Sequence, residues 1–205
     1  MKTKIASLFC LCACCFLFYQ CNTASTNTPS INDSTANAAS CVYGGYANQT
    51  DWGKHLATTL GCGDCHTPKK MTAQGPADDS SLLFAGHLSQ LPAPVISTAE
   101  LAQGVAATND LTAWLGAWGT SYAANITPDS TGIGNWKEEQ FITCIRQGLY
   151  KGLVGTRPIM PPMPIYSYRN LTDDELKALF AFLKTIRPVH NVVAEYQPPA
   201  GAMHQ

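Results

Sequence analysis

The chain has 205 residues, of which 45% are hydrophobic and 13% are charged, and its formal net charge is −1. This length allows one domain with appendages, or two small domains at most. The small net charge gives no indication of nucleic-acid binding or of a strongly charged membrane-binding patch.

The N-terminus has the pattern of an export signal. Lys2 and Lys4 precede a continuous apolar run of about 15 residues, from Ile5 to Tyr19. Such a run is short for a transmembrane helix, and a basic start with a short apolar core is typical of a secretory signal. We therefore assign residues 1–20 to a signal peptide and expect a protein exported to the periplasmic side of a bacterial membrane.

Cys21 stands at the end of this signal, in the place of the lipid-attachment cysteine of bacterial lipoproteins. The preceding letters LFYQ lack the usual small residues, so an ordinary cleaved signal and an uncleaved anchor are alternatives. The next stretch, Asn22–Ser40, is small, polar and free of aromatic residues, so it cannot bury enough surface to fold. We predict lipidation at Cys21 and a flexible tether over residues 21–46.

The first predicted helix, Asp51–Leu60, leads into a C-x-x-C-H motif at Cys62, Cys65 and His66. A redox dithiol usually follows a strand, and a structural zinc site needs further ligands, whereas C-x-x-C-H is the signature of covalent haem attachment. The two thiols add to the vinyl groups of one haem, and the adjacent histidine reaches the iron from the same face. We interpret the motif as the attachment site of haem c.

The stretch between His66 and Asn135 shows no sustained period-two or helical pattern, which predicts a long loop insertion. Its aromatic residues Trp114, Trp118 and Tyr122 are expected to cover a haem edge, with plain core packing as the alternative. The sequence contains no second C-x-x-C-H and therefore predicts one haem.

Two further helices are predicted over residues 135–148 and 171–188. Because no segment shows sustained period-two alternation, we expect an all-α fold. The apolar residues of these two helices recur at helical spacing. Each begins with the residues of a capping box, Asn135 with Glu138 and Thr172 with Glu175.

The proline-rich stretch Thr156–Tyr168 offers two methionines for the second axial position, Met160 and Met163. Methionine sulfur is the usual partner of histidine on a haem iron of high potential, and stiff prolines hold a loop in place at low entropic cost. We favour Met163, because Met-Pro is followed closely by an aromatic residue and a helix. One alternative is that both methionines are plain core residues. Met71 is too close to His66 to reach the other haem face, and Met203 lies in the C-terminal tail. The histidines His55, His87, His190 and His204 are other candidates for the ligand, with His87 the strongest rival.

The order of helix, C-x-x-C-H, Gly-Pro, capped helix, Met-Pro loop and C-terminal helix resembles a class I c-type cytochrome domain. The stretches NITPDSTGIGNW and RPIMPPMPIYSYRNLTDDELKALFAFLKTI resemble more specifically the cytochrome domains of multi-haem dehydrogenase subunits and their single-haem lipoprotein relatives. The resemblance covers Ala47 to Gln197. It implies a single-haem cytochrome domain over residues 47–197, which leaves residues 198–205 as a disordered tail.

The resemblance also implies a role for individual residues. Cys62 and Cys65 would carry the thioether bonds, and His66 and Met163 would be the axial ligands of the haem iron. The Pro76 carbonyl would accept the second N–H of His66. The long segment between Pro76 and Asn125 departs from the family pattern, so the resemblance does not assign the propionate contacts, and we name Asn125 and Arg157 as candidates.

These features predict an electron-transfer protein rather than an enzyme, with a dehydrogenase, an oxidase or another cytochrome as its redox partner. One alternative is a haem enzyme or gas-binding protein with an open distal site near His87. Another is a permanently docked electron-transfer subunit of a dehydrogenase. Of the remaining cysteines, Cys144 lies on an apolar helix, so a buried free thiol is expected there rather than a disulfide with Cys41.

Overall fold

The computed structural model describes residues 42–95 and 97–199. The predicted signal peptide, Cys21, Cys41 and residues 200–205 lie outside the described residues. The elements in chain order, with η for a 3-10 helix, are α2 (Gln49–Thr59), α3 (Cys62–His66), β1 (Lys69–Thr72), β2 (Gly75–Asp78), η1 (Ser80–Leu82), α4 (Thr98–Leu101), β3 (Ala106–Ala107), β4 (Ala113–Gly116), β5 (Gly119–Tyr122), α5 (Glu138–Gln147), η2 (Tyr150–Gly152), α6 (Ile165–Tyr168) and α7 (Asp173–Leu183).

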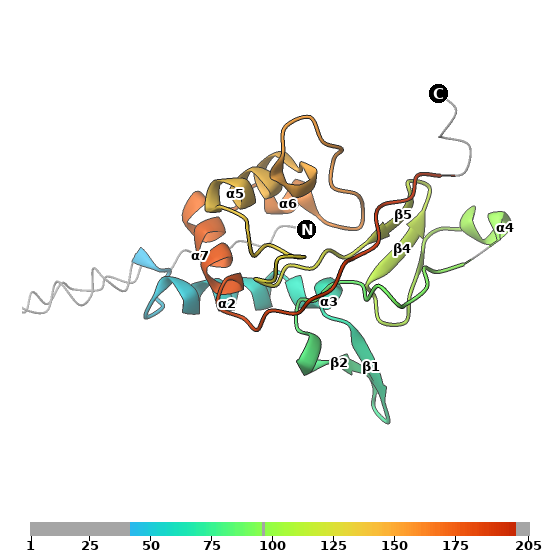
Figure 1. Ribbon diagram of the computed structural model, residues 1–205, viewed down its shortest axis with the longest axis horizontal. Helices are drawn as coiled ribbons and strands as arrows, with labels where there is room; N and C mark the ends of the chain where they lie inside the picture. Colours follow the sequence, from blue (N-terminus) through green and yellow to red (C-terminus); the bar gives the residue numbers. More distant parts are fainter. Residues whose placement is uncertain (1–41, 96, 200–205) are drawn as a thin grey trace, which may run out of the picture. The chain divides into compact units, whose positions relative to one another are not determined.

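The core lies where α2, α5 and α7 meet (Figure 1), and a glycine lets two of these helices approach closely. A Cβ atom added to Gly53 of α2 would lie only 1.9 Å from the Ala178 carbonyl oxygen of α7. The buried residues that join the three helices are apolar, namely Leu56, Ala57, Phe141, Ile145, Leu176, Leu179, Phe180 and Leu183. The helical half of the fold is therefore held together by hydrophobic burial.

The predicted helices are present, but their ends differ from the sequence pattern. α7 begins with the expected capping box, in which Thr172 Oγ1 accepts a hydrogen bond from Glu175 N and the Glu175 carboxylate accepts one from Thr172 N. The capping box expected at Asn135 is wrong, because α5 has Lys137 as its N-cap without a side-chain cap. Here Trp136 N donates to Ile133 O, so a turn occupies the place of the expected first residues of the helix.

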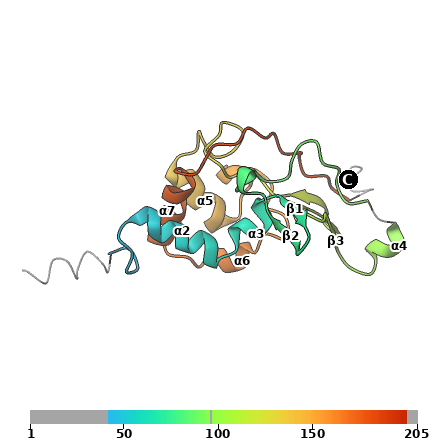
Figure 2. The same cartoon turned by 90° about the horizontal axis from the view of Figure 1, so that it is seen from below.

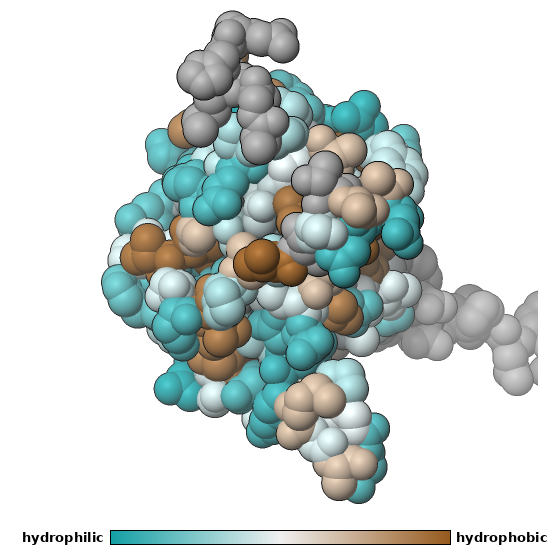
Figure 3. Space-filling model, turned by 90° about the vertical axis from the view of Figure 1, so that its right-hand side faces the viewer, coloured by the Kyte–Doolittle hydropathy of each residue, from teal (hydrophilic) through white to brown (hydrophobic). Residues whose placement is uncertain are grey.

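Short strands fill part of the stretch that the sequence predicts as a long loop, so the all-α expectation holds only for the core. β1 and β2 form an antiparallel hairpin, and β3, β4 and β5 form a three-stranded antiparallel sheet in that order. The hairpin projects from the rest of the described chain (Figures 1 and 3). The strands β4 and β5 show no buried–exposed alternation, which explains why no period-two pattern marks them.

The described chain after α7, residues 184–199, contains no helix or strand but is held at two places. We call residues 189–197 the C-terminal strap. Asn191 is buried near its beginning, and at its end Gln197 forms an isolated bridge with Thr120 of β5. The strap runs from the region of α7 to the sheet that contains β4 and β5, as Figures 1 and 2 both show. No helix in the described part of the chain is long and apolar enough to cross a membrane.

Candidate functional site

The C-x-x-C-H motif forms its own short helix, α3, directly after α2. Gly61 joins the two helices in the left-handed conformation (φ +67°), which glycine adopts without steric cost. Lys69 Nζ then donates to the carbonyl oxygens of Gly63, Asp64 and Thr67, at 3.0, 2.9 and 2.6 Å. The Lys69 ammonium group thus binds the carbonyl groups at the C-terminal end of α3, the helix that carries Cys62, Cys65 and His66.

The two thiols of the motif are not activated. Burial raises the pKa of Cys62 to about 11, and burial also raises the pKa of Cys65. Reactive C-x-x-C thiols show the opposite shift, because they react as thiolates. Together with the preceding helix α2, where a redox dithiol normally follows a strand, these shifts argue against the dithiol interpretation.

The His66 ring is oriented by a backbone carbonyl. His66 Nδ1 lies 2.7 Å from the carbonyl oxygen of Ala124, and since a carbonyl only accepts, Nδ1 carries the proton. Burial lowers the pKa of His66, which favours the neutral ring with Nε2 free to bind a metal. The expectation for Pro76 is wrong, because this residue sits in the β1–β2 hairpin, where it pairs with Met71.

One cavity of about 480 Å³ brings the predicted ligands together. Cys62, Cys65 and His66 line it, and so do Met160 and Met163. Most of its remaining lining is apolar, from residues such as Leu60, Ile126, Ile133, Phe141, Ile145 and Leu179. Its volume falls within the roughly 300–1,000 Å³ typical of cofactor sites.

Met163 and Met160 differ in their surroundings. Met163 is half-buried and packs against the apolar core, and its carbonyl accepts a hydrogen bond from Ile165 N at 2.9 Å, so α6 starts directly after it. Met160 lines the same cavity but is not among the residues packed against that core. Met71 is 69% exposed on the β1–β2 hairpin, away from the cavity lining.

The rival histidines have other surroundings. His87 is fully buried, its Nδ1 lies 2.8 Å from Thr112 Oγ1, and its Nε2 lies 3.1 Å from Leu91 O. His55 stacks on Tyr46, and His190 lies 3.4 Å from Asp129 Oδ1. Within the described residues, none of these three histidines belongs to the cavity lining.

Two of the three aromatic residues that we expect to cover a haem edge line the cavity. Trp114 and Tyr122 line the cavity, whereas Trp118 does not and instead donates from Nε1 to Ser121 Oγ. Tyr168 also lines the cavity, and its hydroxyl donates to the carbonyl of Leu60 at the end of α2. Burial raises the pKa of Tyr168 to about 12, so the hydroxyl keeps its proton.

The two residues expected near the propionates both line the cavity, with different free groups. Asn125 Nδ2 donates to Thr131 Oγ1 and to Val189 O, so its N–H groups are already used. Cζ of the Arg157 guanidinium lies 3.8 Å from the centre of the Tyr150 ring, and Arg157 Nη1 donates to Pro158 O. Of the two residues, Arg157 is the one with N–H groups left to donate to a propionate carboxylate.

Several cavity residues were not predicted by the sequence. The strap contributes Val192, Ala194 and Tyr196, and α5 contributes Cys144, a buried free thiol whose pKa burial raises to about 11. Ala124 and the strap residues come from segments without a motif of their own. The one available signal was the stretch NITPD, which follows Ala124 directly.

The donor set fits a haem better than a structural metal ion. Two thiols, an imidazole and a thioether line one apolar cavity, as covalent haem c with two axial ligands requires. Within the described residues there is no group of three or more His, Cys, Asp or Glu side chains that could hold a metal ion. The cavity residues therefore match the chemistry that haem c needs.

Comparisons with known proteins also relate this chain to haem proteins. The family model of cytochrome c matches residues 51–187. The fructose dehydrogenase cytochrome subunit of Gluconobacter japonicus is 29% identical over 139 residues, which is 67% of this chain and 21% of that subunit. The gluconate 2-dehydrogenase cytochrome c subunit of Pantoea cypripedii is 40% identical over 73 residues, which is 35% of this chain and 16% of that subunit.

A subunit of the nicotinate dehydrogenase of Pseudomonas putida is also 40% identical over 73 residues, or 35% of this chain and 6% of that relative. The matched part thus spans 21% or less of each of these three relatives. The family match itself covers well over half of this chain and includes the two cysteines, His66 and both loop methionines. The chain therefore belongs to the cytochrome c family.

Proposed function

We propose that this chain is a single-haem electron-transfer protein, with Cys62 and Cys65 as the attachment points and His66 and Met163 as the axial ligands. The observation that carries this proposal is the single apolar cavity that all four side chains line. When bound, the haem supplies an iron that carries one electron by cycling between its ferrous and ferric forms. Family membership implies this covalent haem c.

The residues of the chain then have separate tasks. Cys62 and Cys65 would anchor the haem, and the Ala124 carbonyl keeps the proton of His66 on Nδ1, which leaves Nε2 to bind the iron. The Met163 thioether would be the second protein ligand of the iron, which would leave no position on the metal for a substrate. The apolar walls exclude water, and this low polarity, together with the thioether, favours a high reduction potential.

We further propose that the redox partner is a dehydrogenase or the complex that contains one. The relatives named above are cytochrome subunits of fructose and gluconate dehydrogenases and a subunit of nicotinate dehydrogenase, which supports such a partner. The low charge of the chain favours stable docking over long-range electrostatic steering. Export by residues 1–20 and a lipid anchor at Cys21 would place the domain at the periplasmic surface of a membrane.

Visible spectroscopy of the haem-loaded full chain tests the proposal. We expect a low-spin ferric spectrum, a covalent haem that stays attached on denaturation, and no rapid carbon monoxide binding to the ferrous protein. A high-spin ferric spectrum with rapid carbon monoxide binding would contradict it and would favour an open distal site. Reduction of the haem by a purified dehydrogenase of the host would support the proposed partner, and its absence with every such enzyme would count against it.

A further inference from the structure

The carbonyl that orients His66 is held from both sides along the chain. Next to Ala124, Ala123 N donates to Thr112 O at 2.8 Å, and Ala123 O accepts from His87 N at 2.9 Å. Two residues further on, Ile126 N donates to Phe84 O at 3.0 Å. The segment with the acceptor of His66 is therefore bound along the turn that contains residues 84–87.

Within that turn, Gly86 lies directly against the Ala124 peptide group. A Cβ added to Gly86 would lie 2.5 Å from the Ala124 carbonyl carbon and 2.6 Å from its oxygen. Gly86 N donates to His66 O at 2.8 Å, so the same residue also contacts the backbone of the axial histidine. Any displacement of Gly86 is thus passed to both partners of the His66–Ala124 hydrogen bond.

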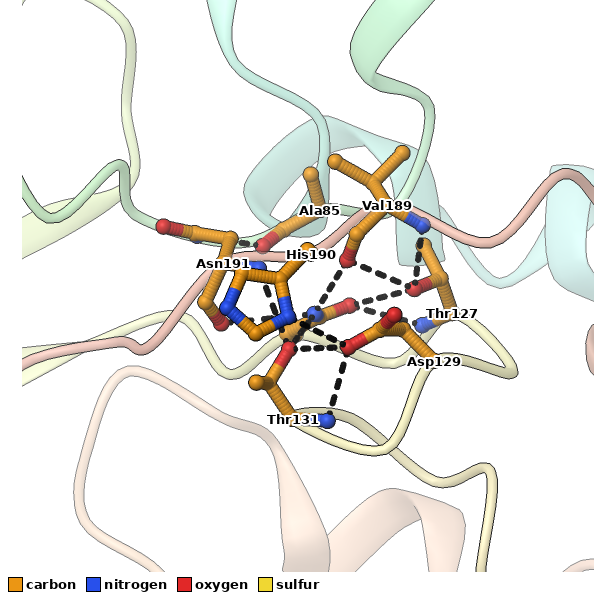
Figure 4. A network of polar contacts seen from close by, with 8 residues as sticks. Ala85, Thr127, Asp129, Thr131, Val189, His190 and Asn191 are labelled. Atoms are coloured by element: carbon orange, nitrogen blue, oxygen red, sulfur yellow. Dashed lines mark hydrogen bonds and ion pairs between the residues drawn. The ribbon is translucent and has the colours of Figure 1, made fainter.

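Asn191 of the C-terminal strap holds the residues on either side of Gly86. Its Nδ2 donates to Ala85 O and to His87 O, both at 2.8 Å, and its Oδ1 accepts from Ser89 N at 3.1 Å. The side chain is only 5% exposed, so these bonds are made away from water. Figure 4 shows Asn191 beside the Ala85 carbonyl in the network that joins the strap to residues 127–131.

A second set of contacts fixes Asn191 itself. Asn191 N donates to Thr131 Oγ1 at 3.0 Å, and Val189 N donates to Thr127 Oγ1 at 3.1 Å (Figure 4). Asn125 Nδ2 donates to Val189 O at 2.8 Å. Hydrogen bonds therefore fix the backbone of the strap at residues 189 and 191. The family match ends before the strap, at residue 187.

We infer that Asn191 is a positioning residue for the axial histidine: it fixes the turn at Gly86, which holds the Ala124 carbonyl on the Nδ1–H group of His66. This inference rests on the proposed function, since it assigns the strap a role in tuning the haem. A hydrogen bond from the ligating histidine raises the basicity of the ligand and stabilises the ferric state. Loosening the Ala124 carbonyl therefore raises the reduction potential.

Two variants of the haem-loaded full chain test the inference, Asn191→Ala and Gly86→Ala. In both we expect a higher midpoint potential and faster solvent exchange of the His66 Nδ1 proton, measured by NMR of the ferrous protein. The ferrous–ferric equilibrium should shift by about threefold, because Asn191 and Gly86 act through Ala124, whereas losing the direct hydrogen-bond partner of a metal ligand costs roughly 10- to 100-fold in metal affinity or activity. If Asn191→Ala does not yield haem-loaded protein, Asn191→Ser, which keeps one donor, should give a smaller shift of the same sign.

Matched controls separate positioning from stability. Asn170 Nδ2 also donates to two carbonyls, of Tyr166 and Ser167, but it is exposed and lies just after α6, so Asn170→Ala should leave the potential unchanged. Gly45 has a positive φ of +88° with nothing near a Cβ atom, so Gly45→Ala controls for backbone strain at Gly86.

A lower melting temperature with unchanged potential and proton exchange in Asn191→Ala and Gly86→Ala would overturn the inference. The same result would leave Asn191 a purely structural residue. If the unmodified protein itself shows no low-spin histidine ligation, that result would instead contradict the proposed function.

Discussion

The two sides of the cavity are built by different means. On the His66 side, the ligand is oriented by Ala124, and buried asparagines and threonines from residues 125–131 and 189–191 hold the surrounding backbone. On the Met163 side, prolines stiffen the loop, and few hydrogen bonds fix it, such as Ile159 N to Gly148 O at 2.8 Å. The comparison teaches that one ligand is held by long-range polar contacts and the other by local chain stiffness and apolar packing.

The largest expected difference between the two sides is in haem retention. The double variant Cys62→Ala, Cys65→Ala should lose covalent haem completely, because both thioether bonds come from the His66 side. Met163→Ala should keep its haem through denaturation. Haem staining of denatured full-length protein measures this, and covalent haem remaining in the double variant would refute the assignment of the motif.

Stability should also be more sensitive on the His66 side. Asn125 is 4% exposed and its Oδ1 also accepts from Thr127 N, so Asn125→Ala leaves several buried groups without partners. We expect a loss of about 2–4 kcal/mol in the free energy of unfolding, measured by urea denaturation. The exposed N-cap Asn48→Ala serves as the control and should cost about 1 kcal/mol. Equal losses in the two variants would contradict the importance of the buried network.

A smaller loss is expected for the contact that holds the Met163 loop. Ser121 Oγ of β5 donates to Pro161 O and accepts from Trp118 Nε1, and Ser121→Ala removes both bonds. The cost in unfolding free energy should be about 1–2 kcal/mol, below that of Asn125→Ala. Ser167→Ala, on the exposed face of α6, is the matched control and should change little. A loss for Ser121→Ala that exceeds that for Asn125→Ala would reverse the comparison.

The smallest effects should appear as opposite pH dependences. Hydrogen bonds from Thr131 lower the pKa of Asp129 below its usual 3.8, so its contribution to stability is present above that pH and is lost as the pH falls through the folded pKa. Burial raises the pKa of Cys144 from 9.0 to about 11, so its contribution is present below pH 9 and is lost as the pH rises toward 11.

Unfolding measured across the pH range tests both signs. Asp129→Asn should flatten the acid limb alone, and Cys144→Ala should flatten the alkaline limb alone. If either variant leaves its own limb as steep as in the unmodified chain, the titration of that group does not control the limb.

The same contrast explains how much the sequence could predict. The Met163 loop, the C-x-x-C-H motif and the capping box at Thr172 are local patterns, and the structure contains these elements in the predicted places. The acceptor of His66 is 58 residues away, and the strap residue Asn191 is still more distant, so neither follows from a local pattern. The family resemblance implies Pro76 as the acceptor, but in this chain Pro76 lies in strand β2 of the β1–β2 hairpin.

The central claim is the axial pair of His66 and Met163, and one spectroscopic comparison tests it most directly. The oxidised full-length protein should show the weak far-red absorption that a methionine–ferric iron bond gives. Met163→Ala should abolish this band while Met160→Ala keeps it, because Met163 alone of the two packs against the core at the cavity wall. A band that survives in Met163→Ala, or disappears only in Met160→Ala, would contradict the account.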